Sequence, residues 1–169
     1  MQSDAEIFSP SGLLANSFPG FTHRQAQQDM ASLVSRLLAS DGHLVIEAGT
    51  GIGKTFAYLI PVLLSGKRAI ISTGTHTLQD QLYDRDLPML SAAVGRPTKV
   101  SVLKGRNNYL CWHRLEVNRT GGSGNTKVAN GLVDITQWAK ITKSGDLAEL
   151  KKYPEGIAFR GSITSTVDN

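Results

Sequence analysis

Cysteine is nearly missing from this sequence, which has Cys111 as its single thiol among 169 residues. One cysteine cannot build a disulfide framework within the chain, and it cannot by itself complete a zinc or iron–sulfur site. Long apolar runs are missing too, since the longest uncharged segment, residues 7–23, is broken by Pro10 and Pro19. That segment falls short of the roughly 20 mostly apolar residues that span a bilayer. Residues 1–10 carry acids where a signal peptide needs bases, so we expect a soluble, cytoplasmic protein without a membrane partner.

A surplus of positive charge is confined to one segment. Lys and Arg together number 18, Asp and Glu together number 14, and the formal net charge is +4. The whole surplus lies in residues 99–119, which contain five basic residues and a single acidic residue, Glu116. A neutral body with one basic segment indicates an anionic partner there, although charge alone also allows a solvated face.

Alternating patterns predict an α/β fold for the first part of the chain. Short apolar runs at residues 43–48, 68–73 and 99–103 are typical of buried strands. Helical periodicity predicts helices that begin near Thr22, Lys54 and Thr77. Thr22 and Gln25 have the spacing of a capping box, and Pro88 is expected to stop the third helix. Strands that alternate with helices predict a parallel sheet with flanking helices.

The chain is expected to have three parts. Residues 1–20 show little periodicity and predict an irregular lead-in, and residues 21–105 carry the α/β pattern. Residues 106–169 differ in character and predict only short helices, after a Gly- and Asn-rich run at residues 118–131 that we expect to be mobile.

A phosphate-binding loop is the strongest single signal in the sequence. It follows a predicted strand, opens a predicted helix, and consists of Ala48, Gly49, Thr50, Gly51, Ile52, Gly53, Lys54 and Thr55. Glycines let backbone N–H groups approach phosphate oxygens, Lys54 can reach the β- and γ-phosphates, and the Thr55 hydroxyl can bind Mg²⁺. The strict pattern begins with Gly where this chain has Ala48, and the alternative is a glycine-rich turn with a chance Lys-Thr.

Four stretches in order resemble the iron–sulfur superfamily-two DNA helicases of the DinG/YoaA (XPD-like) family. The loop 48–55 resembles motif I, and Phe21, Arg24, Gln27 and Met30 resemble the preceding segment that holds adenine. Residues 71–75 with 78–81 resemble motif Ia, and residues 104–111 resemble the entry to the iron–sulfur domain. The resemblance implies a RecA-like P-loop domain that is followed by the start of an iron–sulfur domain. It also implies ATP and Mg²⁺ as cofactors, movement along single-stranded DNA from 5′ to 3′, and a role in DNA repair or replication stress.

The resemblance also implies roles for individual residues. Lys54 and Thr55 would be catalytic, and Arg24 and Gln27 would join the loop in binding ATP. The implied contacts to single-stranded DNA are Thr73, Gly74, Thr75, Lys104, Arg106 and Tyr109. From the residues alone, Gln27 can equally be a helix-surface side chain and Thr75 a plain helix cap, while Tyr109 and Trp112 can be core residues.

Cys111 resembles the first of four cysteines that hold a [4Fe–4S] cluster in that family. Three ligands are missing from the sequence, so we expect no stable cluster, and the alternative is a small buried hydrophobe. No Asp-Glu-Ala-His box and no second motor domain follow the P-loop, so we expect an N-terminal fragment of a helicase that binds ATP without turning it over. Two alternatives stay open: a small P-loop kinase, and a truncated product that binds nucleotide or DNA without catalysis.

Overall fold

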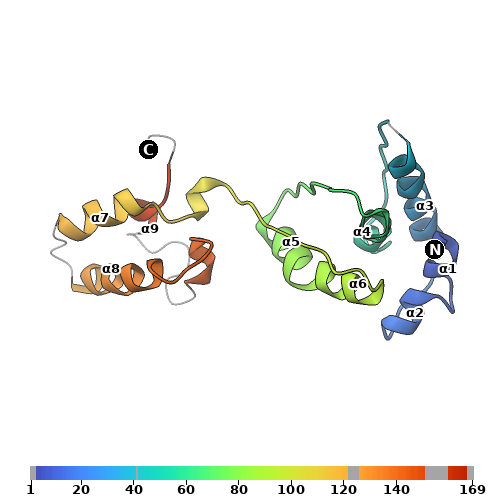
Figure 1. Cartoon of the computed structure of the whole chain (residues 1–169), viewed down its shortest axis with the longest axis horizontal. Helices are drawn as coiled ribbons and strands as arrows, with labels where there is room; N and C mark the ends of the chain where they lie inside the picture. Colours follow the sequence, from blue (N-terminus) through green and yellow to red (C-terminus); the bar gives the residue numbers. More distant parts are fainter. Residues whose placement is uncertain (1–2, 41, 122–125, 151–159, 167–169) are drawn as a thin grey trace. The chain divides into compact units, whose positions relative to one another are not determined.

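The computed structural model describes residues 3–40, 42–121, 126–150 and 160–166. The chain divides into two compact units, Met1–Val102 and Leu103–Asn169 (Figure 1). Each unit has its own hydrophobic core. None of the helices in the described ranges is both long enough and apolar enough to cross a bilayer.

The lead-in is helical, which corrects the prediction of irregular structure for residues 1–20. It contains α1 (Asp4–Phe8) and α2 (Leu13–Ser17). Ser3 and Glu6 form a capping box at the start of α1, and this hydrogen bonding lowers the pKa of Glu6. Phe8 is 1% exposed and Leu14 is fully buried. Helices of five residues are too short to show a repeating pattern, which is why the sequence did not predict them.

The core of the first unit forms around α3 (Gln25–Ala39) and α4 (Lys54–Ser65), which pack against each other (Figure 1). The helix that begins at Lys54 is confirmed. The predicted cap of α3 is wrong, because Arg24 holds the N-cap position and no side chain bonds there. The buried residues of this core are Ile7, Phe8, Leu14, Ala31, Ala57, Leu59, Ile60, Leu63, Leu82 and Leu90.

The expected parallel sheet is not formed in the part of the chain that the structure describes. Residues 43–48, 68–73 and 99–103 run without strand structure, and two isolated bridges, at Tyr109 and Leu110, are the β-type pairings given for the described residues. Val45 is 96% exposed and Ile70 is 99% exposed, so the prediction of buried strands is not confirmed for these segments. A strand is stable when its backbone N–H and C=O groups bond to those of a neighbouring strand, and no such ladder joins these three segments in the described residues.

One helical segment continues past Pro88, contrary to the predicted stop. It comprises α5 (His76–Gln81), the π-helical turn η1 (Leu82–Asp86) and α6 (Leu87–Ala93). The amide of Leu87 donates to the carbonyl of Leu82, one residue further back than in an α-helix. Pro88 then lies in the first turn of α6, directly after the π-helical turn.

The second unit is ordered well beyond the short helices that the sequence predicts. It contains η2 (Arg106–Asn108), α7 (Trp112–Thr120), α8 (Thr126–Ala139), η3 (Leu147–Glu149) and α9 (Arg160–Ile163). Helices α7 and α8 lie side by side (Figure 1). Their core consists of Leu115, Leu132, Ile135, Ala139, Leu147 and Ile163. Helices α7 and α8 include residues 118–120 and 126–131 of the run that is expected to be mobile, and residues 122–125 lie outside the described residues.

Candidate nucleotide and nucleic-acid site

The side chain of Lys54 closes the glycine-rich loop. Lys54 is the first residue of α4, and its ammonium donates to the carbonyl of Ala48 at 2.9 Å and of Gly49 at 2.7 Å. Ile52 packs beside Gly49, since its Cδ1 lies 3.7 Å from the position of a Cβ on that glycine. The ammonium is therefore held over the loop by two carbonyl oxygens, which phosphate oxygens can replace.

The loop leaves the N-terminus of α4 open. Gly51 and Gly53 have φ angles of 80° and 86°, which are left-handed values that side chains other than glycine adopt at a cost. Gly53 is the N-cap of α4, and no side chain bonds to the first turn there. The first amides of a helix have no partner within it, so they and the helix dipole favour an anion at this end.

The two residues expected to bind adenine lie on α3 and its cap. Arg24 is exposed, whereas Gln27 is only 2% exposed, which rules out the alternative of a helix-surface glutamine. The Gln27 amide Nε2 donates to the carbonyl of Gly53 at 2.9 Å. The Gln27 side chain, which the sequence singled out, therefore links α3 to the loop. Its bond to the Gly53 carbonyl was not predicted from the sequence.

A partly buried tyrosine of α4, Tyr58, is hydrogen-bonded to Thr55, and the sequence did not single it out. Burial raises the pKa of the Tyr58 phenol; a hydrogen bond with Thr55 opposes the shift, and the charge of Asp86 adds to it. Asp86 is 2% exposed and accepts from Gln81 Nε2 at 2.9 Å and Arg85 Nε at 2.8 Å. No sequence signal marks Asp86, because its burial depends on the π-helical turn.

The expected DNA contacts are divided between the two units. In the first unit, Thr73 donates its hydroxyl to the carbonyl of Thr75 at 3.2 Å, and Thr75 caps α5 by accepting from the amide of Leu78 at 3.3 Å. The capping role of Thr75 is therefore confirmed, and it leaves Gly74 exposed between the two threonines.

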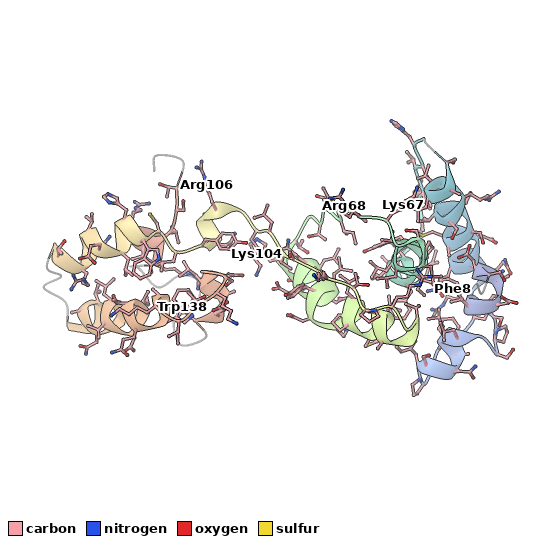
Figure 2. All side chains as sticks on the ribbon, in the orientation of Figure 1. Phe8, Lys67, Arg68, Lys104, Arg106 and Trp138 are labelled. Atoms are coloured by element: carbon pink, nitrogen blue, oxygen red, sulfur yellow. The ribbon has the colours of Figure 1, made fainter. Side chains whose placement is uncertain are left out.

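In the second unit, two of the three expected contacts are engaged within the fold. The Lys104 ammonium forms an ion pair with Asp146 at 3.0 Å, and the Tyr109 hydroxyl accepts from the amide of Lys104 at 2.9 Å. Arg106 is exposed at the start of η2 and extends away from the ribbon (Figure 2). Trp112 is 54% exposed, so core packing is not its role.

Cys111 stands at the N-cap of α7 and is held by the end of the described chain. Its amide donates to the carbonyl of Ile163 at 2.8 Å, and Arg114 donates to the carbonyl of Thr164 at 3.2 Å. Within the described ranges, no three His, Cys, Asp or Glu side chains gather where a metal ion could bind. The residues present thus do not fit a [4Fe–4S] cluster, which needs four thiolates.

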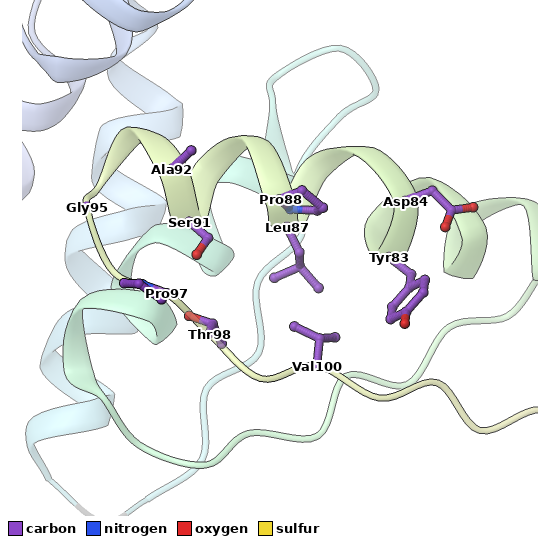
Figure 3. Close-up of a pocket in the computed structure, with 10 residues that line it drawn as sticks. All are labelled: Tyr83, Asp84, Leu87, Pro88, Ser91, Ala92, Gly95, Pro97, Thr98 and Val100. Carbon is purple, nitrogen blue, oxygen red and sulfur yellow. The ribbon is translucent and has the colours of Figure 1, made fainter. Parts of the chain in front are cut away.

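A pocket of about 740 Å³ lies in the first unit away from the loop (Figure 3). Its lining is mostly apolar and includes Tyr83, Leu87, Pro88, Pro97 and Val100. No residue of the glycine-rich loop contributes to it. The pocket lies between α6 and residues 97–100, next to the segment expected to form the third strand. We therefore do not assign it as a nucleotide site.

Comparisons with known proteins agree on one family. The family model for DEAD/DEAH box helicases matches residues 24–124. The chain is 44% identical to the ATP-dependent DNA helicase YoaA of Haemophilus influenzae over 166 residues, which are 98% of this chain and 26% of that protein. It is 43% identical to the protein of the same name in Escherichia coli, covering 96% and 26%. It is 36% identical to the ATP-dependent helicase DinG of Mycobacterium tuberculosis, covering 78% and 23%. The chain spans about a quarter of the length of these relatives.

Proposed function

Because the chain belongs to the DEAD/DEAH box helicase family, we propose that it forms part of an ATP-dependent DNA helicase and carries the phosphate-binding loop of a RecA-like motor domain. The observation that carries the proposal is the position of Lys54, whose ammonium is held by two loop carbonyls at the open N-terminus of α4. A helicase uses such a loop to bind the triphosphate whose hydrolysis drives its movement.

The chemistry of the loop follows from its geometry. A triphosphate would place several negative charges beside the first amides of α4 and the Lys54 ammonium. Without it, that ammonium bonds to backbone carbonyls. Lys54 would exchange the oxygens of Ala48 and Gly49 for the β- and γ-phosphate oxygens, and Thr55 would offer its hydroxyl to Mg²⁺. Arg24, exposed at the cap of α3, would lie beside the nucleotide.

We propose that the three apolar runs form strands of a parallel sheet within the complete motor domain. Val45 and Ile70 are almost fully exposed here, and burying them against neighbouring strands would be favourable by about 1.5–3 kcal/mol for each side chain. Segments with this composition are typical of strands that are covered on both faces.

The proposed nucleic-acid partner is single-stranded DNA, which the protein would bind mainly through the DNA phosphates. Thr73, Gly74 and Thr75 would contact phosphates at the start of α5. Among the DNA contacts expected in the second unit, Arg106 is the exposed cation. Lys104 and Tyr109 would support the segment that presents Arg106, because their polar groups are bonded within the fold. Movement from 5′ to 3′, a role in DNA repair and a cytoplasmic location complete the proposal, as the resemblance implies.

Calorimetry with ATP and Mg²⁺ tests the nucleotide part. Lys54→Ala should weaken binding by about 1.5–3 kcal/mol, the range for hydrogen bonds to charged groups. Arg68→Ala is the matched control, because it removes an exposed cation of the same unit (Figure 2). Equal affinity of the Lys54→Ala variant and the unaltered chain would remove the P-loop assignment. Phosphate transfer to a nucleoside monophosphate would favour the kinase alternative, and we expect none.

A further inference from the structure

Trp112 is exposed at the start of α7, although the backbone on either side of it is held in place. Its side chain is 54% exposed. The residue before it donates its amide to the carbonyl of Ile163 at 2.8 Å, and Leu115, one turn further along α7, is 1% exposed in the core of the unit. The indole is therefore presented to solvent by an anchored backbone, which lowers the entropy cost of binding a partner to it.

The loop of residues 142–146 leads toward this indole. Asp146 forms an antiparallel bridge with Tyr109, and the amide of Leu110 donates to the carbonyl of Gly145 at 2.9 Å. In an antiparallel pair, a step forward along one segment is matched by a step back along the other. The loop therefore runs back from Gly145 toward the start of α7, and Lys143 is its exposed cation.

Glu149 holds this loop in shape and has its own oxygens occupied. Its Oε2 accepts from the Thr142 hydroxyl at 2.9 Å and from Trp138 Nε1 at 3.2 Å, and its Oε1 accepts from the Ser144 hydroxyl. Lys143 lies between the two hydroxyl residues, and none of these hydrogen bonds uses its ammonium. The carboxylate is thus engaged by neutral donors, which leaves the ammonium available to an anion.

The charges of the second unit favour a nucleic acid as that anion. The two ion pairs within its described ranges use Lys104 and Arg119, whereas Arg106 and Lys143 are exposed and belong to neither pair. Proteins bind single strands by stacking bases on aromatic side chains while basic side chains neutralise the phosphates. An exposed indole in a unit with exposed cations supplies both kinds of contact.

We propose that Trp112 stacks against a base of single-stranded DNA and that Lys143 binds a neighbouring phosphate. The inference rests on the proposed function, since it extends the DNA contacts expected of the second unit. It adds a contact to a base, which the phosphate contact of Arg106 does not supply. Every base has a flat face, so this contact would not distinguish one sequence from another.

Fluorescence anisotropy on the 169-residue chain separates stacking from phosphate binding, by comparing oligothymidine with an abasic oligomer of the same length. Trp112→Ala should weaken oligothymidine binding about tenfold, within the range for one stacked base, and leave the abasic affinity unchanged. Trp112→Phe should restore most of the loss, because a phenyl ring also stacks. Val117→Ala shortens another exposed apolar side chain of α7 and should change neither affinity. Equal weakening of both oligomers by Trp112→Ala would overturn the stacking role.

The same assay tests the phosphate contact. Lys143→Ala should weaken both oligomers alike and lower the slope of log affinity against log salt by about 0.7. Arg119→Ala is the matched control, because it removes the same charge from a side chain that is paired with Glu116, and it should lower the slope by less. An unchanged slope in Lys143→Ala would overturn the contact.

Intrinsic fluorescence gives a second readout. In Trp138→Phe, Trp112 is the one tryptophan left, and stacking of a base should quench its emission. Unquenched emission with saturating oligothymidine would overturn the inference, whereas absence of oligothymidine binding by the unaltered chain would overturn the proposed DNA partner itself. Dimerisation of the free chain that Trp112→Ala abolishes would also overturn the inference, and would assign the indole to an interface between copies.

Discussion

The Lys104 ammonium lies 3.0 Å from the Asp146 carboxylate, and the two side chains are only 7% and 17% exposed. A second contact holds the same place, because the amide of Leu110 donates to the carbonyl of Gly145 at 2.9 Å. Asp146 also caps η3 by accepting from the amide of Ala148 at 2.9 Å. The ion pair therefore fastens the start of the second unit to the loop after α8.

Removing the lysine should destabilise the second unit. Lys104→Met leaves a largely buried carboxylate without its cation, and we expect a loss of about 2–3 kcal/mol in the free energy of unfolding, below the range for a fully buried pair because Asp146 keeps some contact with water. Denaturant unfolding followed by tryptophan fluorescence measures it, since both tryptophans lie in this unit. Arg119→Met, which breaks the exposed pair with Glu116, is the control and should change nothing measurable.

The burial of Lys104 also changes which cation should govern DNA binding. Arg106→Ala should lower the slope of log affinity against log salt by about 0.7, the value for one phosphate contact on a single strand. Fluorescence anisotropy with a labelled oligothymidine at several salt concentrations gives the slope. Lys104→Met removes no expected phosphate contact, so it should lower the slope by less than Arg106→Ala does, and an equal fall would show that Lys104 contacts DNA directly.

Two glycines of the loop should respond differently to alanine. Gly51→Ala meets no atom within 4 Å and carries only the cost of a left-handed φ, about 1–2 kcal/mol. Gly53→Ala has the same backbone cost and also collides with the Gln27 amide, which adds about 1–3 kcal/mol. Differential scanning calorimetry measures both variants. Equal destabilisation by the two substitutions would mean that the Gln27 amide moves aside freely.

Alkaline pH should weaken the first unit through Tyr58. Its pKa is raised in the folded state, chiefly by burial, so the unfolded chain releases this proton at a lower pH than the folded chain does. The stability is complete below the ordinary tyrosine pKa of about 10 and falls as the pH rises through the higher folded value. Denaturant titrations between pH 8 and about 11 should show this fall. Tyr58→Phe should remove that part of the fall, and an identical profile would contradict the assignment.

The sequence by itself determined the features that depend on neighbouring residues. The glycines of the loop and the apolar face of α4 are local patterns, and the helix begins at Lys54 as they predict. The capping box of Ser3 and Glu6 is also a local pattern, but it was not predicted, because the helix that it opens is too short to show a repeat. The family resemblance also rested on local motifs, which is why the comparisons agree with it.

The tertiary structure alone decided everything that depends on distant residues. Apolar runs such as the one with Val45 look like strands, but a strand needs partners along its length, and here that side chain is 96% exposed. Lys104 stays a predicted DNA contact, and only the fold shows that Asp146, 42 residues further along, pairs with it. The sequence allowed Gln27 to be a surface residue, and only the fold shows that it is buried and bonded to Gly53. Local patterns determine backbone conformation, whereas burial and ion pairing arise only when remote segments meet.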